Sequence, residues 1–222
     1  HHRSSAASDV YKRQIISNAC PGPGACGGMY TANTMSSAIE AMGMALPYNS
    51  SNPAISRDKL NEKETISKSI INLIKKDIKP SDIITKKSIE NAVRLITLLG
   101  GSTNAVLHIL AICKTANIDF NIDDFQKISE ETPFLANLKP SGKYLMEDLH
   151  NIGGIPSVMK FMLQNNMLHN DCMTVTGKTI EENLKTIESI NFDQDIIRPL
   201  DNPIKSSGPV SYTHLRAHET RF

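Results

Sequence analysis

The sequence predicts an α/β domain in which helix-rich layers pack around a sheet. Apolar residues recur with a helical period along most of the chain, and short apolar runs such as 173–176 lie between these patterns as strand candidates. A hydrophobic content of 40% in 222 residues can supply a core. The net charge of +1 gives no reason to expect nucleic acid or an anionic membrane as a partner, and no apolar run approaches the length of a membrane span.

The first expected helix follows a loop, 19–28, that is rich in Gly and Pro. Small and apolar residues then recur at steps of three or four from Met29 to Leu46, so we expect a helix there that Pro47 ends. Further amphipathic patterns predict helices over about 58–77 and 86–99. Thr85 is the expected N-cap of the second of these.

The second half of the chain shows several further helix starts. Ser102 can cap a helix whose apolar stripe includes Cys113, which is therefore expected in the core. The other expected starts are Asp123 as an N-cap, a helix opened by Gly153 with Pro156 in its first turn, and a capping box of Thr179 and Glu182.

The four cysteines do not suggest a disulfide framework, and a reducing compartment with a metal or thiol role fits better. Cys26 stands in the Gly-rich loop just before the first expected helix. Unpaired amides and the positive end of the helix dipole favour a thiolate there, which can bind a metal or attack an electrophile. A small, inert, buried thiol is the alternative. The Cys20–Cys26 spacing is not one typical of zinc sites.

Residues 19–44 closely resemble the signature of dihydroxy-acid dehydratases, within a larger family that includes sugar-acid and phosphogluconate dehydratases. Three further stretches resemble the same family and follow in its order: 100–108, 138–144 and 174–179. Four motifs in one order are much harder to meet by chance than one. The resemblance covers about residues 15–208.

The resemblance implies an iron–sulfur cluster held by three cysteines from separate loops, with Mg²⁺ nearby. Cys26 matches the third cluster cysteine, and we assign Cys20 to shaping the loop. A 2Fe–2S cluster is favoured over 4Fe–4S. The other two cysteines, a magnesium-binding aspartate and a carbamylated lysine are expected before residue 15. The base, a serine, and a magnesium-binding glutamate are expected after residue 209. No catalytic residue is therefore expected within this chain, which should be inactive alone.

The reaction implied by the resemblance is dehydration of a 2,3-dihydroxy acid. The iron polarises the C3 hydroxyl, a base removes the C2 proton, water leaves, and the enol relaxes to a 2-keto acid. The expected substrates are 2,3-dihydroxy-3-methylbutanoate and its methylpentanoate homologue, in valine and isoleucine biosynthesis. A homodimer is expected, with no nucleic-acid or membrane partner. The expected compartment is the cytoplasm in a bacterium, or a mitochondrion or plastid in a eukaryote.

Two other functions remain open. One is a sugar-acid dehydratase of the same superfamily, acting on gluconate or arabonate. The other is a non-enzymatic metal-binding or redox-sensing module built on Cys20 and Cys26.

The two ends differ in composition from the middle. Residues 15–209 hold 16 Lys and three Arg, whereas the first 14 and last 13 residues hold four of the seven Arg and four of the seven His. We interpret 1–14 and 210–222 as non-native adapter translation. Residues 15–198 are then expected to form part of an N-terminal α/β domain. Residues 199–209 are expected to be a linker towards a missing, β-barrel-like C-terminal domain.

Overall fold

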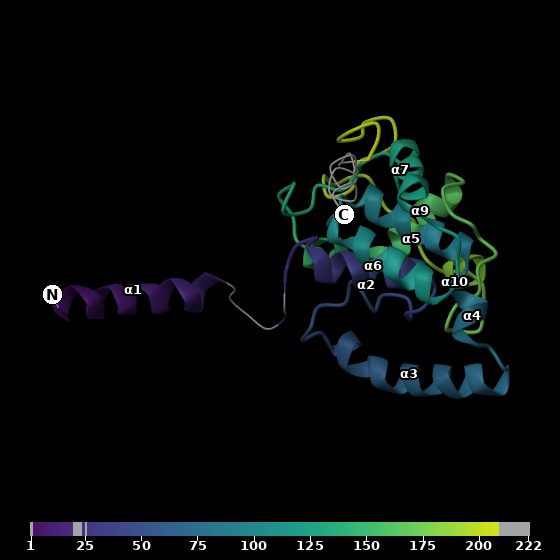
Figure 1. Cartoon of the computed structure of the whole chain (residues 1–222), viewed down its shortest axis with the longest axis horizontal. Coiled ribbons are helices and arrows are strands. Elements are labelled where there is room, and N and C mark those ends of the chain that lie inside the picture. Colours follow the sequence, from purple (N-terminus) through teal and green to yellow (C-terminus); the bar gives the residue numbers. More distant parts are fainter. Residues whose placement is uncertain (1, 20–23, 25, 209–222) are drawn as a thin grey trace, which may run out of the picture.

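A computed structural model describes residues 2–19, 24 and 26–208 of the chain. Helices dominate this part, as the sequence predicts, and Figure 1 shows most of them gathered in one body. In chain order they are α1 His2–Ala19, α2 Thr31–Ala41, α3 Arg57–Lys75, α4 Pro80–Ile83, α5 Lys86–Leu98, α6 Asn104–Thr115, α7 Ile122–Glu131, α8 Met146–Asn151, α9 Gly154–Gln164 and α10 Ile180–Leu184. Within the described ranges, none of these helices has the length and apolarity needed to cross a bilayer.

The expected sheet is not seen, because the described residues contain isolated β-bridges and no strand. The strand expected at 173–176 is reduced to one bridge between Met173 and Thr179. The reason is local: Thr174 N–H donates to the Lys178 carbonyl oxygen at 3.0 Å, and Gly177 turns the chain with a φ of +72°. The segment therefore closes on itself as a tight turn.

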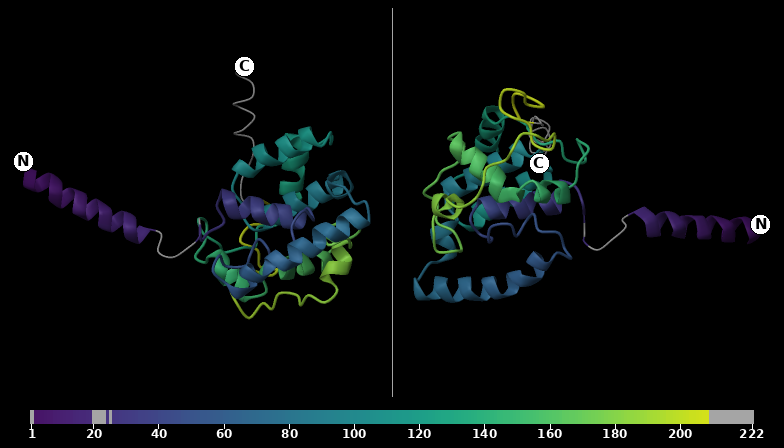
Figure 2. Two further views of the ribbon diagram at one scale, coloured as in Figure 1. Left: turned by 90° about the horizontal axis from the view of Figure 1, so that it is seen from below. Right: turned by 180° about the vertical axis from the view of Figure 1, so that it is seen from behind.

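The long first helix, α1, stands apart from the body in both Figure 1 and Figure 2. Its residues 8–17 are all exposed. Residues 210–222 lie outside the described residues. The interpretation of both ends as non-native, and the domain boundaries at 198 and 209, stay predictions.

The predicted end of the α2 helix was wrong, because the helix stops at Ala41, six residues before Pro47. Met44 N–H donates to the Ile39 carbonyl oxygen at 3.0 Å, and Gly43 has a left-handed φ of +86°. This is the pattern by which glycine commonly terminates a helix. Gly43 is needed here for a second reason, since a Cβ on it would lie 2.8 Å from the Met173 carbonyl oxygen.

Two of the four predicted caps are confirmed, and the expectation for Ser102 was wrong, because the N-cap residue of α6 is Thr103. Thr85 accepts from Ser88 N–H at the start of α5, and Thr179 with Glu182 forms the capping box of α10. The expectation for Asp123 was wrong. Asn121 caps α7, since its Oδ1 accepts the N–H of Asp123 at 2.8 Å. Asn is a favoured N-cap residue, and Asn121, two residues before Asp123, occupies the N-cap position.

The core consists of two apolar clusters, and α2 and α5 contribute to both. One cluster lies towards α9 and includes Met29, Ala41 and Leu98. The other lies towards α6 and α7 and includes Ala38 and Cys113, whose predicted burial is confirmed. Helix α2 contacts α5, α6 and α9. It is therefore held from several sides, which fixes the segment that precedes it.

Helix α3 differs from the helices that form the core, because none of its residues is buried. It lies along the edge of the body (Figure 1) and contacts it through polar groups, such as Asn72 Nδ2 donating to the Thr176 carbonyl oxygen at 3.1 Å. Five of its six large apolar side chains are exposed instead: Leu60, Ile66, Ile70, Ile71 and Ile74. Exposed apolar patches of this kind promote association.

We expect the double substitution Ile70→Gln and Ile74→Gln to reduce self-association of this chain without destabilising it. Both side chains are more than half exposed, so little core packing is lost. Light scattering across a concentration series measures the association. Lys68→Gln, on the same helix, is the control. Equal association in the double variant and the control would contradict a role for this face.

Candidate functional site

The four motifs that carry the family resemblance meet along α2. The 138–144 stretch lies at its N-terminal side, where Met29 N–H donates to the Lys139 carbonyl oxygen at 2.7 Å. The 100–108 stretch lies against its first turns, where Ser102 N–H donates to Thr34 Oγ1 at 3.0 Å. The 174–179 stretch lies at its far end, where Val175 N–H donates to the Gly43 carbonyl oxygen at 2.8 Å. Segments that lie far apart in the sequence therefore all contact α2 or the residues at its ends.

The backbone around Gly28 approaches its neighbours too closely to admit a side chain. A Cβ on Gly28 would lie 2.9 Å from the Lys139 carbonyl oxygen and 2.6 Å from the Tyr30 ring. Asn33, in the first turn of α2, donates through Nδ2 to the carbonyl oxygens of Cys26 at 3.0 Å and Gly28 at 2.6 Å. These bonds hold the loop against the start of the helix.

Cys26 lines a cleft of about 280 Å³ between this loop and a polar wall. Residues 49–54, which follow α2, form the wall. Lys59 and Glu147 add charged groups of opposite sign to the lining. The remaining lining residues are Gly24, Gly27, Ala32, Asn33, Ser36 and Met146. The cleft thus combines a thiol, amides, hydroxyls and a few apolar side chains.

The Cys26 side chain is half-buried and faces this cleft, but its surroundings differ from the expectation. Helix α2 begins at Thr31, so four residues separate the cysteine from the helix. In the described part of the chain, the hydrogen bond of its Sγ is donated to the Gly28 carbonyl oxygen at 3.9 Å, with no helix amide as a partner. Cys20 lies outside the described residues, so its expected role in shaping the loop stays a prediction.

The other two described cysteines are poor candidates for chemistry. Burial raises the pKa of Cys113, and it raises the pKa of Cys172 to about 11. Both side chains are buried in the core clusters. A thiol that is buried and protonated is a weak nucleophile and a weak metal ligand. Cys26 is therefore the accessible thiol among the cysteines that the structure describes.

Within the described ranges, no group of three or more His, Cys, Asp or Glu side chains is placed to hold a metal ion. A single accessible thiol fits one ligand position of a multi-ligand cluster but cannot hold a cluster alone. The donor set present is thus compatible with the expectation that further ligands come from other segments.

Two carboxylates that the sequence reasoning missed hold the polar wall. Glu40, on α2, accepts backbone N–H groups from Tyr48 at 2.8 Å and Ser50 at 2.9 Å. Glu62, on α3, accepts the side-chain amides of Asn49 at 2.6 Å and Asn52 at 2.9 Å. A sequence signal for Glu40 existed, since it follows Ser36 at a step of four on the small and apolar face of the helix. For Glu62, in a helix rich in charge, we find none.

Comparison with known proteins agrees with the motifs. Residues 1–183 match a family model described as dihydroxy-acid/6-phosphogluconate dehydratase N-terminal. A dihydroxy-acid dehydratase of Lactococcus lactis subsp. cremoris is 59% identical over 195 residues, which are 87% of this chain and 34% of that protein. One of Flavobacterium psychrophilum is 59% identical over 194 residues, or 87% of this chain and 35% of that protein.

A chloroplastic dihydroxy-acid dehydratase of Arabidopsis thaliana is 54% identical over 207 residues, which are 93% of this chain and 34% of that protein. The chain therefore spans about a third of the length of the curated relatives it matches.

We expect Gly28→Ala to destabilise the chain by about 1–3 kcal/mol, because the added methyl group meets a backbone carbonyl that cannot easily move. Gly27→Ala is the matched control, since its Cβ would meet only the flexible Leu145 side chain at 3.2 Å. Denaturant unfolding measures both. Equal stability of the two variants would show that the close approach at Gly28 is not tight.

Proposed function

We propose that the protein dehydrates a 2,3-dihydroxy acid to a 2-keto acid, because the chain belongs to the dihydroxy-acid/6-phosphogluconate dehydratase N-terminal family. The relatives that match it over about 90% of its length are named dihydroxy-acid dehydratases. The observation that carries the proposal is the accessible thiol of Cys26, in a cleft beside the helix on which all four motifs meet.

Cys26 serves in this proposal as one of three cysteine ligands of an iron–sulfur cluster, of the 2Fe–2S type in preference to 4Fe–4S. When bound, such a cluster supplies an open iron position that acts as a Lewis acid towards a hydroxyl group. The half-buried position of Cys26 supports this role, because a ligand must be reachable from the cleft. Asn33 holds the backbone of Cys26 and so orients its side chain.

The remaining parts of the chemistry lie outside this chain in the proposal. The other two cysteines, the magnesium ligands and the serine base belong to further segments of a longer protein. The relatives are about three times as long as the region that they share with this chain. The chain alone should therefore bind no stable cluster and catalyse no turnover.

Branched-chain dihydroxy acids are the proposed substrates. The cleft offers apolar groups for a small branch, among them Ala32, Pro53, Ala54 and Met146. It also offers hydroxyl and amide groups for the carboxylate and the two hydroxyls of the substrate. A sugar acid would leave hydroxyls against the apolar groups, at about 1–3 kcal/mol for each unpaired group. The product would be a keto acid on the route to valine or isoleucine.

The wider architecture follows from the same proposal. The isolated β-bridges, such as that between Ala136 and Ile197, support a sheet completed by other segments of the protein. A β-barrel-like C-terminal domain follows the segment 199–209. We also propose a homodimer, which the exposed apolar side chains of α3 support. The proposed compartment is the cytoplasm if the protein is bacterial, or an organelle if it is eukaryotic, as the name of the chloroplastic plant relative supports.

We expect Cys26→Ser in the complete protein to lose most of its iron, because an alcohol is a poor ligand for iron–sulfur clusters. Cys113→Ser and Cys172→Ser are the controls, since both thiols are buried away from the cleft. Assays of iron and acid-labile sulfide on the purified variants measure the cluster. Full occupancy in the Cys26 variant would exclude it as a ligand. A Cys20–Cys26 disulfide that forms under mild oxidation in a complete protein without iron would favour the redox module.

We expect the complete protein to convert 2,3-dihydroxy-3-methylbutanoate to 3-methyl-2-oxobutanoate faster than it dehydrates gluconate or arabonate. The apolar groups in the cleft favour a branched aliphatic chain over a chain of hydroxyls. A keto-acid assay with the three substrates at equal concentration measures the preference. Faster turnover of either sugar acid would assign the protein to the sugar-acid dehydratases.

A further inference from the structure

Glu40 is a charged side chain that the proposed chemistry does not use, although it is only 4% exposed. Its Oε1 accepts Tyr48 N–H at 2.8 Å, and its Oε2 accepts Ser50 N–H at 2.9 Å. The Ser50 hydroxyl also donates to Oε2. One carboxylate therefore takes three donors from the first residues of the loop that forms the polar wall.

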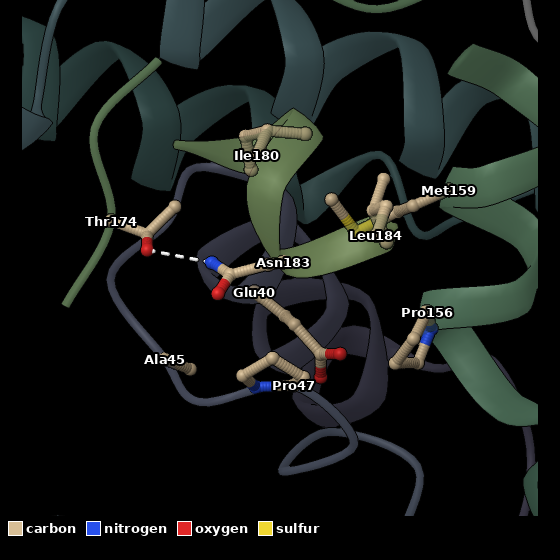
Figure 3. A pocket seen from close by; sticks show the side chains of 9 residues that line it. All are labelled: Glu40, Ala45, Pro47, Pro156, Met159, Thr174, Ile180, Asn183 and Leu184. Carbon is tan, nitrogen blue, oxygen red and sulfur yellow. Dashed lines mark hydrogen bonds between the residues drawn. The ribbon is translucent and has the colours of Figure 1, made fainter. Parts of the chain in front are cut away.

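The surroundings of Glu40 are largely apolar. Figure 3 shows its carboxylate between Pro47 and Pro156, at a cavity of about 20 Å³, which is room for about one water molecule. Met159, Ile180 and Leu184 line the same cavity. No Lys, Arg or His in the described part of the chain forms an ion pair with Glu40. The titratable groups that face it are Tyr48 and Glu62. The hydrogen bonds from Tyr48 N–H, Ser50 N–H and the Ser50 hydroxyl therefore offset the cost of burying the Glu40 carboxylate.

The loop held by Glu40 has a backbone that needs such support. Tyr48 has a φ of +71°, which is rare for a residue with a large side chain. The next residues, Asn49 to Asn52, line the cleft opposite Cys26. Ser51 Oγ also accepts Ile155 N–H at 3.3 Å, which ties the same wall to α9. Loss of the hydrogen bonds from Tyr48 and Ser50 to Glu40 would therefore release the first residues of the wall.

The helix that carries Glu40 also positions the other side of the cleft. Asn33, two turns earlier on α2, holds the Cys26 loop. We propose that Glu40 is a positioning residue for the ligand of the Cys26 cleft, because its carboxylate holds the start of the polar wall in place relative to the thiol. The identity of this ligand rests on the proposed function, whereas the position of the wall does not.

Protonation of Glu40 weakens its hold on the wall, whereas it increases the stability of the folded state. Burial, with a smaller contribution from Glu62, raises the pKa of Glu40 to about 7, although its hydrogen bonds lower it. Above this pKa, the carboxylate accepts all three donors. Below it, the carboxyl group is neutral, so its hydrogen bonds to the three donors are no longer charge-assisted and the wall is held less well. The ordinary pKa of 4.5 applies in the unfolded state, so the stability that this group contributes is fully present below 4.5 and is lost as the pH rises from there through 7.

The test compares Glu40→Gln with Glu62→Gln by hydrogen exchange of the backbone amides. We expect at least tenfold lower protection of the Tyr48 and Ser50 amides in Glu40→Gln at pH 8, because the amide –NH₂ replaces one acceptor. Glu62 accepts side-chain amides, so its variant should keep this protection. In the parent chain, protection of these two amides relative to α5 should fall from pH 8 to pH 6, and Glu40→Gln should not show this fall.

A kinetic arm uses the complete protein. Glu40→Gln should raise KM for the dihydroxy acid several-fold while iron content stays at the parent level, because the Cys26 loop is held separately. Unchanged amide protection or an unchanged KM would overturn the proposal. If Glu40→Gln does not fold, Ser50→Ala, which removes the hydroxyl donor to Glu40, replaces it, and unchanged protection of the Tyr48 amide in that variant would overturn the proposal. A parent protein without dehydratase activity would refute the proposed function, while the amide measurements would still test the wall.

Discussion

The close contact between the backbone at Gly28–Met29 and the Lys139 carbonyl is the constraint on which the Cys26 cleft depends. Met29 N–H bonds to that oxygen, and there is no room for a Cβ on the preceding residue. The contact joins the loop that carries the thiol to a segment more than a hundred residues later. A second contact, from Met146 N–H to the Gly27 carbonyl oxygen at 2.7 Å, strengthens the same junction.

Packing around α2 converts this junction into a defined site. The helix lies between two apolar clusters, so it cannot rotate without disturbing both. Its first turn orients the loop through Asn33, and its last turn meets the loop 48–52 through Glu40. The cleft therefore owes its shape to the core and not to the loops alone, which is typical of sites that must hold a reactive group in one place.

Local signals in the sequence were enough to predict most of the helices. Thr85 and Thr179 were identifiable as caps because the hydrogen bonds they make stay within one turn. Cys113 was placed in the core by the period of its neighbours. The strand at 173–176 was wrong for a reason that is also local. Gly177 turns the chain, so Thr174 N–H bonds to the Lys178 carbonyl oxygen within the same segment.

The site was predictable only in part. Cys26 stands out through its Gly-rich context and the family motif, but its distance from the helix start depends on how the loop folds. Glu40 and Glu62 act through contacts with residues 8 to 13 positions away, across a turn whose path the sequence does not reveal. A buried acid is recognisable only once the burial is known, and burial here is produced by Pro47 and Pro156 from separate segments.

The pitch of one short helix sets the width of the cleft. Asn33 and Glu40 are seven residues apart, which is about two turns, so their side chains leave the same face about 10 Å apart. An insertion or deletion of one residue between them would turn one anchor by about 100° relative to the other. The thiol loop and its facing wall could then not both be held, even with every contacting residue retained. The number of residues between Asn33 and Glu40 therefore matters for the geometry of the site as much as the identity of those residues does.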